Sequence, residues 1–279
     1  MASDMTVATM PYASAVVLGN FHQGAQLFPP TSRGKQCTCN ALVALCLLPD
    51  MPEAITSTNL DNVLYEGNNL YLQLTNRVDE AGYLAFNDLP EEVNVQSRGY
   101  SITAIGDMSY GLMNDVLALQ QDFRSLRENL ADMYAVSNCI LMMLGTSAMC
   151  TYIDEHSNYY VFDSHSRNAF GLMTPDGASV HLQFNDIESV LAYLFALANS
   201  LSAVVLPYEL QAIRITRAVV APQLPDTVHS STDSASTTGE MLDRYFRDQS
   251  DKATNHKPVR KPLPEKRERG SRNFNVNKK

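Results

Sequence analysis

Two short stretches of the chain carry side chains that could do nucleophilic chemistry. Cys37 opens an apolar run within residues 34–42, and more than a hundred residues later Asp163 and His165 stand two positions apart. A thiol attacks as its thiolate, so a reactive cysteine needs a helix N-terminus or a neighbouring imidazolium to lower its pKa. Together these residues are the components of a thiol protease. Each stretch alone is weak evidence, because a lone cysteine at an apolar helix start is usually a small buried hydrophobe.

The elements that contain these residues could position them for such chemistry. Residues 40–48 are apolar nearly all round and stop at Pro49, which predicts a short, deeply buried helix with Cys37 at its beginning. Residues 159–165 resemble a strand, in which alternate side chains face the same way. Asp163 and His165 should therefore share a face, so that the carboxylate can accept a hydrogen bond from the imidazole and fix its tautomer.

Thiol hydrolysis also needs donors for the oxyanion of a tetrahedral intermediate, usually a backbone amide and an amide side chain. Gln23 is the first candidate, since it precedes Cys37 by fourteen residues in a loop punctuated by Gly and Pro. Gln26 is the second. Gln36 is the third, because its adjacency to Cys37 makes the geometry awkward.

Periodicity predicts the remaining elements. A second helix should begin at a cap at Ser57 or Thr58, and a third should run from about residue 112 to 132. A further helix, from Asp186 to about residue 201, should be capped by Asn185 or Asp186. Helices come mainly first and strands mainly later, which predicts an α+β fold with helices packed on a central, mainly antiparallel sheet. Strands are expected at residues 137–144, 148–153, 159–162, 179–184, 203–206 and 212–216.

Composition suggests one domain followed by a tail. The chain has 279 residues, of which 45% are hydrophobic, enough for one sizeable core. Near residue 221 the apolar periodicity stops and Ser, Thr, Pro and charged residues follow. Such a segment buries too little apolar area to offset its ordering entropy. We therefore predict a domain at residues 1–220 and a disordered linker at residues 221–279, rich in Ser, Thr and Pro and then basic.

The net charge of -9 is unevenly distributed. Residues 251–279 hold 10 Lys and Arg against 3 Asp and Glu, which leaves 11 against 27 in residues 1–250. An acidic body argues against nucleic acid as a partner and suits a partner with a basic surface. The basic run at residues 257–272 is either a nuclear-localisation or anionic-surface patch or a solvated linker.

The cysteines and apolar stretches exclude other classes of protein. Five scattered cysteines indicate free thiols in a reducing compartment, and no secretory signal is visible. Residues 189–208 carry no charge, but polar interruptions favour a buried helix and strand over a membrane span. His22, Cys39 and Cys46 could be assembled into a metal site, yet Cys-x-Cys without a second pair is a weak zinc signal. We expect no metal, no cofactor and no membrane partner.

Three separate blocks of the sequence resemble a known family. Residues 22–24 (HQG), Phe28 and residues 34–40 (GKQCTCN) resemble the start of the ubiquitin-specific protease module at the N-terminus of herpesvirus large tegument proteins. Residues 60–67 (LDNVLYEG) and 160–166 (YVFDSHS) match the same pattern in order and approximate spacing. The resemblance covers roughly residues 20–215.

This resemblance implies a papain-like cysteine protease that cleaves ubiquitin, and the related modifier of cullins, from lysine side chains after the modifier's C-terminal glycine. It implies that Cys37 is the nucleophile, His165 the general base, Asp163 the orienting acid and Gln23 the oxyanion donor. Cys37 is favoured over Cys39 because the family places the nucleophile directly after the glutamine that matches Gln36.

The resemblance also implies a protein of the virion tegument that acts in the host cytoplasm and nucleus, with other tegument proteins as further partners. The rival hypothesis is a non-catalytic module that keeps the fold and binds ubiquitin or tegument proteins as a scaffold.

Overall fold

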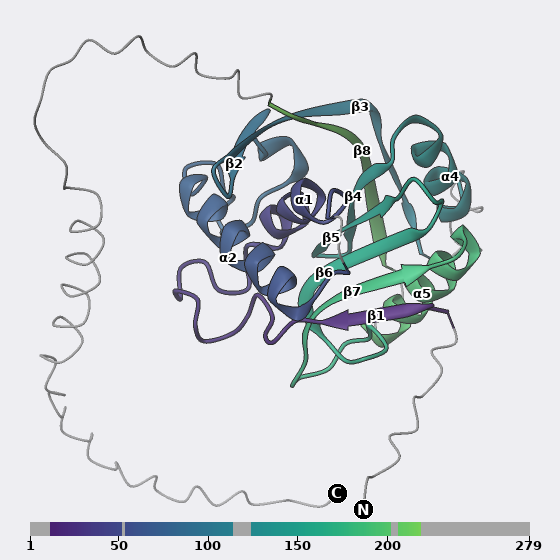
Figure 1. Ribbon diagram of the computed structural model, residues 1–279, viewed down its shortest axis with the longest axis horizontal. Coiled ribbons are helices and arrows are strands. Elements are labelled where there is room, and N and C mark those ends of the chain that lie inside the picture. The colour runs from purple at the N-terminus through teal and green to yellow at the C-terminus, as the bar shows by residue number, and fades with distance from the viewer. Residues whose placement is uncertain (1–11, 52–53, 114–123, 202–205, 219–279) are drawn as a thin grey trace, which may run out of the picture. The chain divides into compact units, whose positions relative to one another are not determined.

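An eight-stranded antiparallel sheet organises the chain in the computed structural model, which describes residues 12–51, 54–113, 124–201 and 206–218 (Figure 1). All of them belong to the first of two units, Met1–Val220. The second unit, Ala221–Lys279, coincides with the predicted linker and lies outside the described residues. The disorder of that linker therefore stays a prediction.

The sheet runs in the order β1-β7-β6-β5-β4-β8-β3-β2, and every neighbouring pair is antiparallel. The mainly antiparallel α+β arrangement expected from the order of the elements is therefore confirmed. The strands are β1 (Ala15–Leu18), β2 (Glu92–Val95), β3 (Arg98–Leu112), β4 (Cys139–Leu144), β5 (Ser147–Ile153), β6 (Tyr159–Arg167), β7 (Ala178–Phe184) and β8 (Pro207–Arg217).

Helices cover both faces of this sheet and create two hydrophobic cores. Residues of β6 alternate between them: Phe162 packs with α1 and α2, and Val161 packs with α4 and α5. This alternation is what a strand buried on both faces requires. The helices of the described residues are α1 (Cys37–Leu47), α2 (Ser57–Gln73), α4 (Leu126–Val136) and α5 (Ile187–Ser200), with a short 3-10 turn η1 (Phe86–Asp88).

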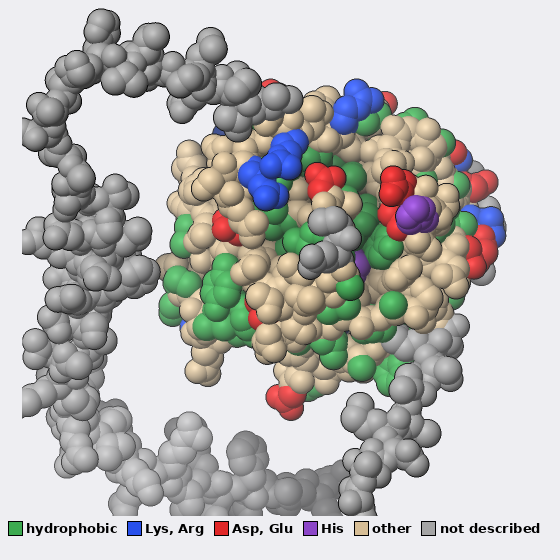
Figure 2. Space-filling view, in the orientation of Figure 1, with side chains coloured by type: hydrophobic (Ala, Val, Ile, Leu, Met, Phe, Trp, Pro, Cys, Tyr) green, Lys and Arg blue, Asp and Glu red, His purple; other side chains and the backbone are tan. Residues whose placement is uncertain are grey.

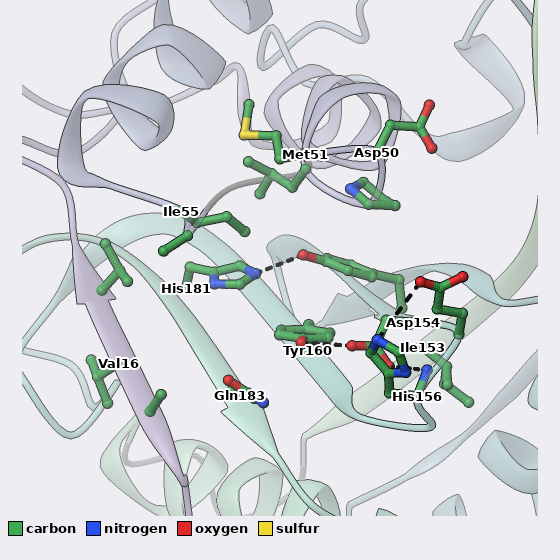
Figure 3. Close-up of a pocket in the computed structure, with 17 residues that line it drawn as sticks. Val16, Asp50, Met51, Ile55, Ile153, Asp154, His156, Tyr160, His181 and Gln183 are labelled. Carbon is green, nitrogen blue, oxygen red and sulfur yellow. Dashed lines mark hydrogen bonds and ion pairs between the residues drawn. The ribbon is translucent and has the colours of Figure 1, made fainter.

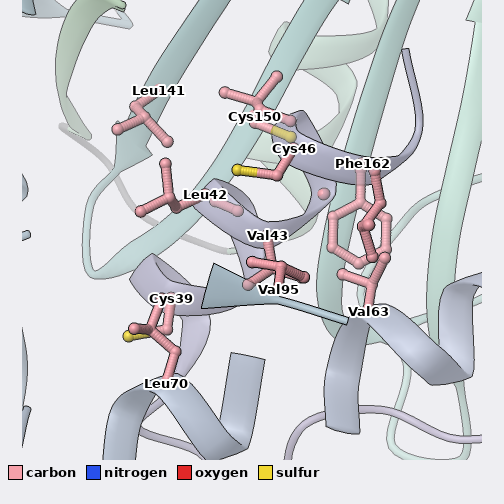
Figure 4. Packing of buried hydrophobic residues seen from close by; sticks show 14 of the residues in the cluster. Cys39, Leu42, Val43, Cys46, Val63, Leu70, Val95, Leu141, Cys150 and Phe162 are labelled. Atoms are coloured by element: carbon pink, nitrogen blue, oxygen red, sulfur yellow. The ribbon is translucent and has the colours of Figure 1, made fainter. Parts of the chain in front are cut away.

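Helix α1 lies between α2 and the sheet, where all eleven of its residues are buried. Leu42 and Cys46 lie near Leu141 and Cys150 in this core, and Val63 from α2 packs in the same cluster (Figure 4). A helix that is apolar all round is stable only when it is surrounded in this way. The predicted short buried helix is confirmed, with Cys37 as its first residue.

One of the two predicted helix caps is confirmed and the other is wrong. Asp186 caps α5 by accepting the backbone N–H of Ser189, as one of the two expected caps. The cap of α2 is Thr56, not Ser57 or Thr58. Thr56 and Asn59 exchange hydrogen bonds between side chain and backbone, so this reciprocal pair fixes an earlier start than the apolar spacing suggested.

The predicted third helix is wrong at both ends. Leu112 ends strand β3, and α4 begins only at Leu126, where Ser125 and Glu128 form a capping box. Residues 114–123 of the predicted span lie outside the described residues. Strand β3 carries three glycines and few buried side chains, so its alternation was too weak to predict a strand.

The last predicted strands are confirmed in part. Residues 212–216 lie within β8, which begins earlier, at Pro207. The strand predicted at residues 203–206 falls largely outside the described residues, and Leu206 itself is not in a strand. Among the described helices, none has the length and apolar character that crossing a membrane requires.

Candidate active site

Cys37 is the first residue of α1 and is only 3% exposed. The first turn of this helix contains no acidic residue, so the partial positive charge of the helix N-terminus acts on the thiol without opposition. This position favours the thiolate, as the sequence suggested for a cysteine that opens an apolar helix.

His165, near the end of β6, lies within hydrogen-bonding reach of the Cys37 thiol. Burial alone would raise the pKa of Cys37, but the hydrogen bond to His165 and the charge of the imidazolium lower it overall. Burial would likewise lower the pKa of His165, yet the Asp163 carboxylate and the Cys37 sulfur raise it to about 9. Each group therefore favours the charged form of the other, the Cys37 thiolate and the His165 imidazolium.

Asp163 lies on the other side of the imidazole and is fully buried. Its Oδ1 accepts a hydrogen bond from Nδ1 of His165 at 2.7 Å and another from the backbone N–H of His165 at 2.9 Å. Burial would raise the pKa of Asp163, but the charges of Arg167 and then His165 hold it well below its usual range. Because an ionised carboxylate only accepts, Nδ1 is the donor and the imidazole presents its other nitrogen away from Asp163.

Strand β6 has a bulge between Asp163 and Arg167, the segment that contains His165. Asp163 pairs with Val180 and Arg167 pairs with Ala178, so four steps along β6 match two along β7. Bulges beside active sites redirect a side chain out of the regular alternation. The sequence predicted that Asp163 and His165 share one face of a regular strand. The extra residues that turn His165 toward Cys37 leave no pattern in the sequence.

Gln23 lies between β6 and the first turns of α1. Its backbone N–H donates to the Ser164 carbonyl at 2.9 Å, and its Oε1 accepts from Ser164 Oγ at 3.1 Å and from Asn40 Nδ2 at 3.3 Å. A Cβ at Gly67 on α2 would collide with the Asn40 side chain, so the two helices hold Asn40 in place. With Oε1 occupied twice, the Nε2 donor of Gln23 is the part of the amide left for a substrate.

The two other candidate glutamines are placed differently. Gln26 is exposed, and its backbone carbonyl accepts from Arg33. Gln36 is fully buried, and its Oε1 accepts the backbone N–H of Lys35. Within the described part of the chain, Gln36 Nε2 has no hydrogen-bond partner. Of the three candidates, Gln23 is the one with hydrogen bonds both to Ser164, beside His165, and to Asn40, in the first turn of α1.

Comparison with protein families decides the family. The profile of the herpesvirus tegument protein N-terminal conserved region matches residues 18–218, which is most of the chain. The chain belongs to this family. A comparison with curated protein sequences finds no match.

A solved structure shares the fold of this tegument domain. It is the ubiquitin-specific protease encoded by murine cytomegalovirus tegument protein M48, in complex with a ubiquitin-based suicide substrate. The two chains are 17% identical and superpose with a TM-score of 0.58 over 73% of this chain and 87% of that chain. The papain-like fold expected from the sequence is therefore confirmed.

Two residues of the tegument domain join the site without having been predicted there. Arg167 donates from Nε to Asp163 Oδ2 at 2.7 Å, and a signal for it exists, because Asp163, His165 and Arg167 alternate along one strand. His22 was considered only as a metal ligand. The pKa of His22 is lowered, first by burial and then by the charge of the neighbouring His165.

The other thiols of the domain lack the environment of Cys37. Cys39 is completely buried, and burial and the neighbouring Cys37 raise its pKa far above the usual range. Burial likewise raises the pKa of Cys46, which lies at the far end of α1. Among the described residues, no three His, Cys, Asp or Glu side chains are grouped as metal ligands would be.

A cavity of about 650 Å³ lies at the opposite end of α1 from Cys37 (Figure 3). It is lined by Leu48, just beyond α1, and by Tyr152, Tyr160 and His181 of the sheet. Tyr152 Oη and His181 Nε2 are 2.8 Å apart there. None of the four predicted site residues lines this cavity, so it is separate from the candidate active site.

Proposed function

We propose that this domain is a cysteine-type hydrolase that removes ubiquitin, and the related modifier of cullins, from lysine side chains. The observation that carries the proposal is the position of His165 between the Cys37 thiol at the start of α1 and the buried Asp163 carboxylate. This is the constellation that activates a thiol nucleophile.

In the proposed reaction the Cys37 thiolate attacks the carbonyl carbon of the isopeptide bond. The negative charge that develops on the carbonyl oxygen is stabilised by Nε2 of Gln23 and by free backbone N–H groups at the start of α1. The C–N bond then breaks, and His165 gives its proton to the departing lysine amine, which leaves a thioester on Cys37. Water attacks this thioester while His165 takes its proton, so that a carboxylate is released and the thiolate returns.

Asp163 has two functions in this scheme. It holds the imidazole with Nδ1 as the donor, and its negative charge stabilises the imidazolium that must exist before the amine leaves. The hydrogen bonds of Asp163 Oδ1 to both the ring and the backbone of His165 support this assignment.

The choice of ubiquitin as substrate is supported from two directions. The structural neighbour is described as a ubiquitin-specific protease with a ubiquitin-based substrate bound. Residues 1–250 hold 27 Asp and Glu against 11 Lys and Arg, and acidic side chains are dispersed over the face in Figure 2. An acidic enzyme surface complements the basic binding face of ubiquitin and speeds their encounter. Cullins carrying the related modifier are the further substrates that we propose.

The competing function is a non-catalytic scaffold that binds ubiquitin or other tegument proteins. A scaffold has no need of a buried carboxylate that orients an imidazole toward a thiol at a helix start. Binding without turnover is its signature.

Fluorogenic ubiquitin and its cullin-modifier counterpart separate these functions. The parent protein should hydrolyse both, and Cys37→Ala should hydrolyse neither while it still binds ubiquitin. A Cys39→Ala protein is the matched control, because Cys39 lies two residues away on the same helix and is buried. Ubiquitin binding by the parent without any hydrolysis would establish the scaffold instead.

As a tegument-family domain, the chain is proposed to act in the virion tegument and in the host cytoplasm and nucleus. The basic residues 251–279 are the proposed source of nuclear entry. Deleting them should abolish nuclear accumulation and leave hydrolysis of fluorogenic ubiquitin unchanged.

A further inference from the structure

Arg167 ends strand β6 with a guanidinium group that is buried beside Asp163. The residue is 2% exposed, and its Nε donates to Asp163 Oδ2 at 2.7 Å. The other carboxylate oxygen, Oδ1, accepts both hydrogen bonds from His165. The two oxygens of Asp163 thus have separate partners, the guanidinium on one side and the imidazole residue on the other.

The chain closes tightly around Arg167. Its backbone bridges to Met173 and pairs with Ala178, and the Gly177 N–H donates to Ser166 Oγ at 2.8 Å. A Cβ at Gly177 would lie 2.4 Å from the Arg167 carbonyl oxygen and 2.5 Å from its nitrogen. The loop between β6 and β7 therefore packs directly on the backbone of Arg167, and the hydrogen bond to Asp163 holds its guanidinium.

This buried ion pair is poorly explained by stability alone. Replacing such a pair by apolar side chains is often neutral or stabilising, because desolvation offsets most of the attraction. Moreover, Arg167 Nη2 has no hydrogen-bond partner among the described residues, although it is buried. A guanidinium placed only to stabilise the fold would be expected to have all its donors satisfied.

Arg167 has an evident electrostatic effect on Asp163. Burial raises the pKa of this carboxyl, and the charge of Arg167 is the largest single cause that lowers it, followed by the charge and the hydrogen bonds of His165. The other titratable groups near the pair are Cys150 on β5 and Tyr193 on α5, and burial raises the pKa of both. Both stay neutral in the physiological range, so Arg167 and His165 are the cations that keep Asp163 ionised.

We propose that Arg167 is a positioning residue of this enzyme, which acts through Asp163 to keep the carboxylate ionised and aimed at His165. The proposal rests on the proposed thiol chemistry of Cys37. It extends the triad of Cys37, His165 and Asp163 to a chain of four residues that ends at Arg167.

Arg167→Met and Arg167→Lys test this proposal on the full chain with fluorogenic ubiquitin. Active sites are first counted with a ubiquitin C-terminal electrophile, so that misfolded protein does not contribute. Arg167→Met should lower kcat about 10- to 100-fold with KM within about twofold, and should move the acid limb of kcat/KM at least about one pH unit upward. Arg167→Lys, which keeps the charge, should restore the acid limb. An unchanged kcat and acid limb in Arg167→Met would overturn the proposal.

A double variant covers the case in which Arg167→Met does not fold. Asp163→Asn with Arg167→Met leaves no buried unpaired charge, and if Arg167 acts through Asp163 its kcat should equal that of Asp163→Asn within about twofold. A further drop of about 10-fold or more from Asp163→Asn to the double variant would contradict action through Asp163.

Alkylation of Cys37 by iodoacetamide separates this proposal from the choice of substrate. Its rate reports the thiolate whether or not the chain cleaves ubiquitin. The pH below which alkylation slows should rise in Arg167→Met, because a weaker Asp163 charge makes the His165 imidazolium less stable and the Cys37 thiolate depends on that imidazolium. A shifted alkylation profile in a chain that does not hydrolyse ubiquitin would support the role of Arg167 and reject the proposed substrate.

Discussion

Nδ1 of His165 lies 2.7 Å from Oδ1 of Asp163, and the same oxygen accepts the backbone N–H of His165 at 2.9 Å. One carboxylate oxygen therefore fixes both the ring and the backbone of the residue two positions later. This double attachment leaves the imidazole little freedom to turn away from Cys37, which lies within hydrogen-bonding reach of it.

Asp163→Asn should reduce activity and stability together. The asparagine amide can donate to the imidazole and so favour the wrong tautomer, which predicts a loss in kcat of about 100-fold or more. It also leaves the buried Arg167 guanidinium without its carboxylate, which should cost about 3–5 kcal/mol of unfolding free energy. Urea denaturation and steady-state kinetics on the same preparation measure both effects. A variant with parental kcat would exclude Asp163 from the mechanism.

The reactivity of the Cys37 thiol should depend on pH as the pKa shifts of Cys37 and His165 require. The pKa of Cys37 is lowered and that of His165 is raised to about 9, so the ion pair exists between these two values. Alkylation of Cys37 should be rapid already near neutral pH, well below the ordinary range of a thiol.

The alkaline side of this profile has the opposite cause. Because the pKa of His165 is raised in the folded state, its stabilising contribution is complete below the unfolded value of about 6.5 and is lost as pH rises through about 9. Values of kcat/KM should fall as pH rises through about 9, since a neutral imidazole cannot protonate the leaving amine. A profile that keeps rising beyond pH 10 would contradict the ion pair.

Gln23→Ala should lower kcat about 100- to 1,000-fold with little change in KM, the loss expected when one oxyanion donor is removed. Gln23→Glu is the sharper variant, because it keeps the size of the side chain and the acceptor for Asn40 and Ser164 but removes the Nε2 donor. Both variants should be equally slow in hydrolysis of fluorogenic ubiquitin. Parental kcat in either would return the role to Gln36, Gln26 or backbone amides alone.

Asp186→Ala is a stability control that is remote from the chemistry. Asp186 caps α5 through the Ser189 N–H, and losing this cap should cost about 1 kcal/mol, or about 2–4 °C in Tm. Differential scanning calorimetry measures the shift. Because α5 does not carry any of the four proposed catalytic residues, kcat at 25 °C should equal that of the parent.

The sequence predicted the parts of this domain that depend on local periodicity. Helix α1, the strand that contains Asp163 and the cap at Asp186 each follow from residues close together in the chain. Strand β3 was missed because its glycines and exposed side chains weaken the alternation, while its pairing with β8 is a contact between distant residues. The start of α4 was missed because a capping box at Ser125 overrides an apolar spacing that continues through residues 112–132.

The candidate site likewise has a local part, which the sequence predicted, and a part that depends on tertiary contacts, which it did not. The relation of Asp163 to His165 is local, and so it could be predicted from strand geometry. The contacts of Gln23 with Ser164 and Asn40, and the close approach of Gly67 to Asn40, join separate segments and depend on tertiary packing. Gln23 was the first candidate from its place in the loop before Cys37, and the family resemblance implied the same residue, but its contacts could not be predicted from the sequence.

The most direct test of the central claim is the attachment of a ubiquitin C-terminal electrophile to the intact protein, with the modified residue located by tandem mass spectrometry. The proposed mechanism predicts one adduct, on Cys37, that is absent in Cys37→Ala and forms at the parental rate in Cys39→Ala. An adduct on another cysteine, or one that forms as fast in Cys37→Ala as in the parent, would contradict it.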